Sequence, residues 1–211
     1  KVKIIEGKTV KLYSDFLIKS TKPTLWKDYV QVQIANHYAP EAGVRGKVKS
    51  TTSMQHTLTG SIYSNSPANT SNGVVNINLT FKDRQILDDK GNIINFLKHE
   101  KIHQDKGDVK SFIDHSKVYL EQLKDNSFTS NTTSEYRIGT VASFANHLLN
   151  ANVEGEDGVD DLIADFNKNN KAGLYLVPSP TNDPKLTTIT IYEGQKAMGI
   201  VSYDKLSSPS K

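Results

Sequence analysis

Cysteine is absent from the 211-residue chain. This absence excludes disulfide bonds, cysteine-ligated metal sites and a cysteine nucleophile. A protein without thiols also suits export from one cell and delivery into surroundings of different redox potential. The sequence therefore gives no sign of a small disulfide-stapled domain.

Long hydrophobic runs are absent too. No segment approaches the roughly 20 consecutive apolar residues that a membrane-spanning helix needs, and no signal peptide is recognisable. The chain begins with Lys1 rather than Met. We therefore expect a fragment or a processed product, without a membrane span, whose targeting segment has been removed.

A strong excess of one charge is the third feature that the sequence lacks. The 26 Lys and Arg residues nearly balance the 23 Asp and Glu residues, and the two signs are interspersed. Nucleic-acid-binding proteins usually concentrate basic side chains with aromatic ones beside them. We therefore expect no nucleic-acid partner.

The first third of the chain has the alternating apolar pattern of β-strands. The pattern predicts a hairpin over residues 1–11 that turns at Glu6-Gly7. It also predicts strands over Tyr29–Ile34 and 46–63, a polar loop over 65–73, and a half-exposed edge strand over Val74–Phe81. On that last strand Val75, Ile77, Leu79 and Phe81 share the apolar face.

The middle of the chain has helical spacing. We expect a first helix that begins at an Asn92 N-cap, runs through Gln104 and stops before Gly107. Further helices are predicted over residues 109–123, 134–150 and 159–167, with a polar loop over 125–133.

The last part returns to strands, with a short strand over 173–177 and a hairpin formed by 186–192 and 197–203. This order predicts an α+β fold. We expect one domain over residues 1–206 and a flexible tail over 207–211. The domain would comprise a β-rich N-terminal part (1–64), a catalytic core (74–170) and a C-terminal β part (173–203).

Residues 99–103 read His-Glu-Lys-Ile-His, which is the motif H-E-x-x-H. On a helix, His99 and His103 lie one turn apart on the same face, so both imidazoles can reach one metal ion. Glu100 can then accept a proton from a water bound at the open position of that ion. Zn²⁺ suits such a nitrogen-rich site. Two histidines that share an exposed helix face by coincidence are the weaker interpretation.

A strand followed by a helix that carries this motif resembles the zincin metallopeptidases. The resemblance implies a zinc-dependent peptidase in which the strand aligns the substrate backbone beside the metal. Val74–Phe81 would be that strand.

A catalytic zinc needs a third protein ligand. The metzincin extension is not matched, because Lys106 and Val109 stand at its Gly and last His positions. His115 is the favoured candidate, since a helical hairpin that turns at Gly107 could return it to the metal. Glu135 is the alternative, in an arrangement resembling the gluzincins, although it could simply favour a helix N-terminus. Asp108 is a weaker third option.

The stretch from His99 through DHSKVYLEQL to NHLLNA, within residues 74–170, also resembles C-terminal metallopeptidase domains of bacterial Rhs-type polymorphic toxins. In that pattern the histidine before Val-Tyr recurs, which supports His115. The resemblance implies a secreted toxin that is delivered into a target cell, a protein or peptide substrate, and an immunity protein as partner.

Three further side chains, Tyr119, Tyr136 and His147, could stabilise an oxyanion, although packing roles are more common for such residues. A function of another class is a non-catalytic binding or carrier module with a structural metal or none. Metal binding distinguishes the two classes, because such a module should not lose a stoichiometric zinc when His99 and His103 are changed.

Overall fold

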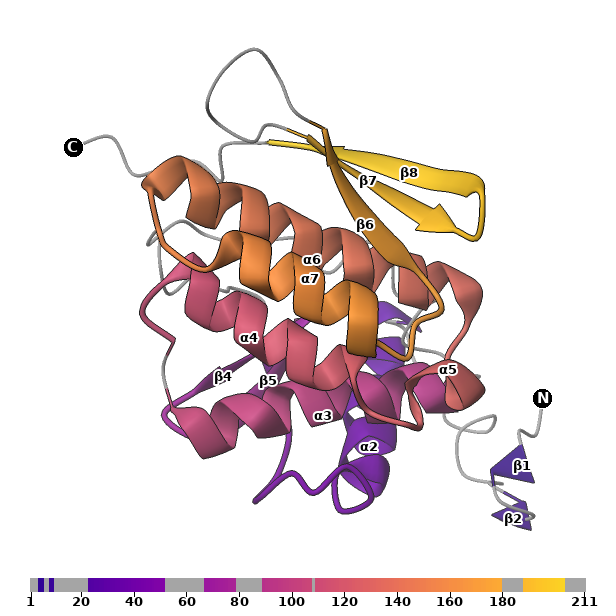
Figure 1. The fold of residues 1–211 in the computed structure, drawn as a ribbon. Helices are drawn as coiled ribbons and strands as arrows, with labels where there is room; N and C mark the ends of the chain where they lie inside the picture. The colour runs from indigo at the N-terminus through magenta and orange to yellow at the C-terminus, as the bar shows by residue number, and fades with distance from the viewer. Residues whose placement is uncertain are drawn as a thin grey trace.

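A computed structural model describes residues 4–5, 8–9, 23–51, 67–78, 89–107, 109–179 and 188–203 of the chain. Within these residues the fold is α+β, as predicted. Figure 1 shows a stack of layers: a C-terminal sheet covers α6, α4 lies beneath α6 and α7, and α3 follows. A second small sheet and α2 pack on the far side of α3.

Among the described residues, the helices are α2 (Pro23–Tyr38), α3 (Lys90–Lys106), α4 (Phe112–Leu123), α5 (Phe128–Asn131), α6 (Ser134–Glu154) and α7 (Val159–Asn169). The strands are β1 (Ile4–Ile5), β2 (Lys8–Thr9), β3 (Lys49–Thr51), β4 (Ala68–Ser71), β5 (Val74–Asn78), β6 (Tyr175–Ser179), β7 (Thr188–Glu193) and β8 (Lys196–Ser202). A search of these residues found no helix with the length and apolar character that crossing a bilayer requires.

The prediction of a strand over Tyr29–Ile34 was wrong, because these residues lie within α2. Proline at the first helical position favours this start, since its fixed φ already fits a helix. The alternating apolar residues continue into Ala35 and Tyr38, which are buried and have helical spacing. The Asn36 side chain then bonds to both the N–H and the C=O of Val48, each at 2.9 Å, and so joins α2 to the approach to β3.

Strands β3, β5 and β4, in that order, form what we call the site sheet. β5 pairs parallel with β3 and antiparallel with β4, so the prediction that it is an edge strand was wrong. The predicted loop 65–73 was partly wrong as well, because it contains β4. Val75 and Ile77 are buried as the alternation required. The predicted strand residues 52–63 and 79–81 lie outside the described residues.

The central helices begin and end at residues whose backbone geometry explains the boundaries. Asp89, and not Asn92, caps α3, and its carboxylate accepts a hydrogen bond from the Asn92 N–H at 3.0 Å. Gly107 ends the helix at φ 79°, a conformation that glycine tolerates. The predicted loop 125–133 contains the short helix α5, which the polar composition did not reveal.

Strands β6, β7 and β8 form the C-terminal sheet, an antiparallel meander. The predicted strand and hairpin are confirmed, with the hairpin turn at Gly194-Gln195. Leu176, Ile189 and Ile191 are buried on its inner face. At the other end of the chain β1 pairs antiparallel with β2, also as predicted. The Glu6-Gly7 turn and the tail 207–211 lie outside the described residues.

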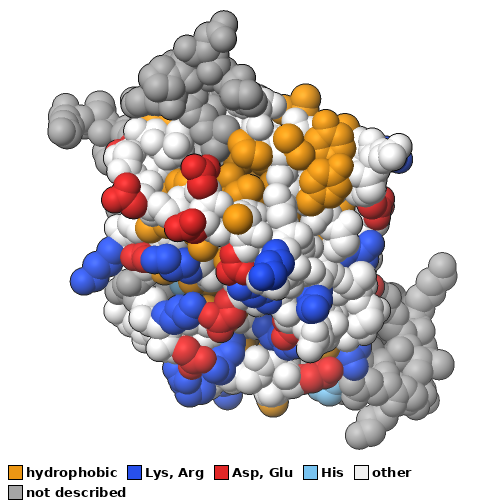
Figure 2. All heavy atoms as spheres, viewed as in Figure 1, with side chains coloured by type: hydrophobic (Ala, Val, Ile, Leu, Met, Phe, Trp, Pro, Cys, Tyr) orange, Lys and Arg blue, Asp and Glu red, His pale blue; other side chains and the backbone are white. Residues whose placement is uncertain are grey.

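Surface side chains differ between the two ends of the stack. Figure 2 shows acidic and basic side chains interspersed over the middle and lower part of this face, and an apolar cluster over the C-terminal sheet. The two large apolar side chains most exposed among the described residues, Val177 and Ile200, lie on the outer strands of that sheet, on either side of Thr190.

Candidate metal centre

Helix α3 presents two histidines from the same face. His99 and His103 are one turn apart, and their Nε2 atoms lie 3.2 Å from each other. His99 is buried and His103 is half-buried. The Gly107 N–H donates to the His103 carbonyl at 2.9 Å, so the helix ends one turn after the second histidine. The chain can then reverse direction and lead into α4.

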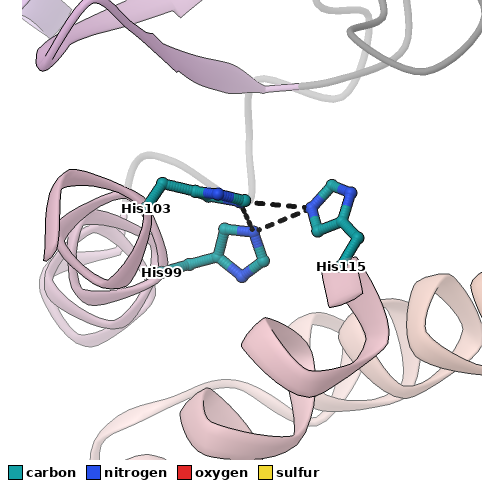
Figure 3. A group of neighbouring side chains, drawn as sticks. All are labelled: His99, His103 and His115. Carbon is teal, nitrogen blue, oxygen red and sulfur yellow. Dashed lines mark hydrogen bonds between the residues drawn. The ribbon is translucent and has the colours of Figure 1, made fainter. Parts of the chain in front are cut away.

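Helix α4 brings His115 to the same point. Its first turn is fixed by two caps: Ser111 accepts from the Asp114 N–H, and the Glu156 carboxylate accepts from Phe112 N–H and Ile113 N–H at 3.1 and 2.7 Å. The His115 Nε2 lies 3.2 Å from that of His103 and 3.4 Å from that of His99. Figure 3 shows the three imidazoles converging from the two helices.

The spacing of these nitrogens fits a tetrahedral metal ion. Ligand nitrogens at about 2.0–2.1 Å from a zinc ion at tetrahedral angles lie about 3.3 Å apart. Among the described residues, the group of metal-binding side chains close enough to share one ion consists of His99, His103 and His115. Glu135 is exposed in the first turn of α6 and is not part of this group. Asp108 lies outside the described residues.

A buried hydrogen bond fixes the orientation of His99. Its Nδ1 lies 2.8 Å from the Gln122 side-chain oxygen, which can only accept. Nδ1 therefore carries the proton and Nε2 keeps its lone pair. Burial and the neighbouring His103 hold the pKa of His99 well below its usual value, so the imidazole is neutral, as a metal ligand must be.

Glu100, next to the first histidine, is also buried. Its Oε2 accepts a hydrogen bond from the Thr70 hydroxyl of β4 at 2.7 Å. Burial raises the pKa of Glu100 to about 7, against the opposing effect of that hydrogen bond. A carboxylate in such surroundings is a stronger base than one in water.

Two further side chains considered from the sequence, Tyr119 and His147, lie beside the histidines. The Tyr119 ring stacks on His115 at 5.2 Å between centroids, and the His147 ring meets His115 edge-on at 4.4 Å. Tyr136 is buried beside Gln122, and its hydroxyl accepts a hydrogen bond from Gln122 Nε2 at 3.3 Å. Burial raises the pKa of Tyr136 and keeps it neutral.

The class of protein follows from a match to a known family. A family model described as "Metallopeptidase toxin 2" matches residues 2–175. The chain belongs to this metallopeptidase toxin family. Comparisons with curated proteins and with solved structures gave no match. Membership implies a metal ion, a peptidase activity and a protein substrate, and the three converging histidines are consistent with the metal.

Sequence reasoning missed two residues that contact the site. Gln122 follows His115 by seven residues, a spacing that places both on one face of α4, so a search along that face could have found it. Thr70 carried no such signal, because it was assigned to a polar loop. Its contact with Glu100 depends on the pairing of β4 with β5.

Proposed function

We propose that this chain is a zinc-dependent peptidase in which His99, His103 and His115 hold the zinc and Glu100 is the general base. The observation that carries the proposal is the mutual spacing of 3.2–3.4 Å among three imidazole Nε2 atoms. Three imidazole ligands leave a fourth position open for water, which is the composition of a catalytic rather than a structural zinc site. The H-E-x-x-H spacing adds an adjacent base.

When bound, zinc lowers the pKa of a water molecule to about 7 and polarises the scissile carbonyl. The protein supplies the proton transfers. Glu100 accepts the proton of the attacking water on its carboxylate and later donates it to the leaving amine. Thr70 holds Oε2, which leaves Oε1 to receive that proton. The buried position of Glu100 keeps bulk water from competing for it.

The strand that aligns the substrate in the zincin resemblance is reassigned here from β5 to β4. β5 is paired on both sides, whereas β4 is at the edge of the site sheet as far as the described strands show. β4 also contacts the motif helix through Thr70 and Glu100. An extended peptide that pairs with β4 would therefore run past Glu100.

The toxin family supports a further part of the proposal, which concerns biological context. We infer that the domain is secreted and delivered into a target cell, where it cleaves a protein. A producing cell would then need an immunity protein that blocks the metal centre. A delivered peptidase without cysteine is not affected by the redox change between compartments.

Elemental analysis and a cleavage assay test the site together. We expect about one zinc per chain in the wild type and in Glu135→Ala, and loss of zinc in His115→Ala. Glu100→Gln should retain zinc and lose hydrolysis by about 10²–10⁴-fold, measured by mass spectrometry on a proteome-derived peptide library. Loss of zinc in Glu135→Ala alone would make Glu135 the third ligand. Absence of zinc from every preparation would favour the non-catalytic binding module.

A further inference from the structure

Gln122 forms a buried connection between the two helices of the metal centre. It lies on α4, two turns after His115, and is 3% exposed. Its Oε1 accepts from His99 Nδ1 at 2.8 Å, and its Nε2 donates to Asn95 Oδ1 at 2.7 Å. Asn95 and His99 are one turn apart on α3, so the Gln122 side chain of α4 bonds to two neighbouring side chains of α3.

We propose that Gln122 is a positioning residue that holds His99 in the tautomer able to bind zinc, and that Asn95 holds the Gln122 amide in the orientation this requires. The inference rests on the proposed zinc site. It assigns to α4 a second contribution besides His115, because the same helix face would supply one ligand and orient another.

The direction of the Gln122 amide determines which His99 nitrogen carries the proton. With its oxygen toward His99, Gln122 requires a proton on Nδ1 and leaves the Nε2 lone pair for the metal. With its NH₂ group toward His99, it would require an acceptor at Nδ1, and the imidazole proton would move to Nε2. That proton would occupy the position that the metal needs.

Asn95 selects between these two orientations. Its Oδ1 faces Gln122 Nε2, and a reversed Gln122 amide would place two oxygens against each other. Tyr136 accepts a second hydrogen bond from the same Nε2 at 3.3 Å. Asn95, Gln122 and His99 are all less than 9% exposed, so water does not replace a lost contact. An unsatisfied polar group at such depth is costly.

The test measures zinc affinity by competition with a chromogenic chelator, and the His99 tautomer by ¹⁵N NMR of the metal-free protein. Gln122→Met preserves length and removes the amide. We expect it to weaken zinc binding by about 10–100-fold and to shift His99 toward the Nε2-protonated tautomer. Gln122→Glu keeps an acceptor for Nδ1, so it should retain the Nδ1-protonated tautomer and bind zinc more tightly than Gln122→Met does.

Asn150→Leu is the matched control. Asn150 is also 3% exposed, and its side chain bonds to Asn146 within α6, away from His99. It should keep both the affinity and the tautomer. If thermal melting shows that Gln122→Met does not fold, Asn95→Ala replaces it, with the expectation of mixed tautomers and weakened zinc binding.

Two outcomes separate this inference from the proposed function. A wild type that binds zinc, together with a folded Gln122→Met of unchanged affinity and tautomer, would overturn the role of Gln122 and leave the peptidase proposal standing. A wild type that binds no zinc would overturn both the proposed function and the inference that depends on it.

Discussion

The two three-stranded sheets pack on different helices, the C-terminal sheet on α6 and the site sheet on α3, and they are built in different ways (Figure 1). The C-terminal sheet is an antiparallel meander that buries Leu176, Ile189 and Ile191. The site sheet is mixed, because β5 pairs in parallel with β3 and antiparallel with β4. It places the polar side chain of Thr70 against buried Glu100, the proposed general base. The C-terminal sheet therefore contributes packing, and the site sheet contacts the proposed active site.

The family match adds to this contrast. It covers residues 2–175, which include the site sheet and all the described helices, and it ends where β6 begins. The matched stretch thus contains the three converging histidines and the helices that position them. Changes at residues that contact the three histidines or Glu100 should therefore alter metal binding or hydrolysis, whereas changes elsewhere should alter stability.

The largest effect that we predict on stability comes from Gly91 in the first turn of α3. A Cβ at this position would overlap the backbone carbonyl of Asn131 in α5. Because backbone cannot move aside cheaply, Gly91→Ala should lower the free energy of unfolding by about 1–3 kcal/mol or more, measured by urea denaturation. Asn131 lies at the end of α5, so the substitution should also disturb how α5 packs on α3.

Gly139→Ala in α6 is the matched control for this prediction. Gly139 is exposed on a helix, and no atom lies within 4 Å of the Cβ position. The alanine should raise the free energy of unfolding by roughly 0.5–1 kcal/mol. Equal effects of the two substitutions would show that α3 and α5 do not approach closely.

The difference between the two sheets also explains which parts of the fold the sequence could predict. The C-terminal hairpin depends on neighbouring strands and a Gly194-Gln195 turn, so its pattern is local. The helices α3, α4, α6 and α7 have long periodic patterns. By contrast, β4 consists of one Ala, one Asn, one Thr and one Ser, a composition that predicts a loop. It forms a strand because it pairs with β5. The alternation in Tyr29–Ile34 was overridden by the helical spacing of Ala35 and Tyr38.

The candidate site divides in the same way. His99, Glu100 and His103 could be found because their spacing has a known chemical meaning. The proximity of His115, the favoured third ligand, could be anticipated because Gly107 allows a helical hairpin, whereas Glu135 remained an alternative that the sequence could not exclude. Thr70 and Asn95 could not be found, since each acts through a contact between elements that no spacing within one element encodes.

An intermediate effect, on hydrolysis, is expected at Thr70. Thr70→Val keeps the shape of the side chain and removes the hydroxyl that holds Glu100 Oε2. We expect hydrolysis to fall about tenfold, the equivalent of one hydrogen bond to a charged group, with zinc content unchanged. Thr190→Val on β7 is the control and should leave hydrolysis unchanged, since Thr190 lies in the other sheet. Equal rates for Thr70→Val and wild type would mean that Glu100 is positioned without β4.

The smallest effect is expected from two lysine–aspartate pairs. Lys98 on α3 contacts Asp125 at 2.8 Å, and Lys124 beside α4 contacts Asp165 of α7 at 2.6 Å. The first pair is the less exposed, and Lys98 also donates to Ser127 at 2.8 Å. Lys98→Met should lower the free energy of unfolding by about 0.5–1 kcal/mol at pH 7, and Lys124→Met by less.

The pH dependence of the Lys98 effect follows from the carboxyl partner. Partial burial raises the pKa of Asp125, but hydrogen bonds from Lys98 and Ser127 outweigh this and hold the pKa below its ordinary value of 3.8. A carboxyl whose pKa is depressed in the folded state stabilises that state above the unfolded value, and the stabilisation is lost as the pH falls through the folded value. The difference between wild type and Lys98→Met should therefore be full at pH 5–7 and shrink below about pH 4. A difference that stays constant down to pH 3 would mean that Lys98 acts through its hydrogen bond to Ser127 and not through the charge of Asp125.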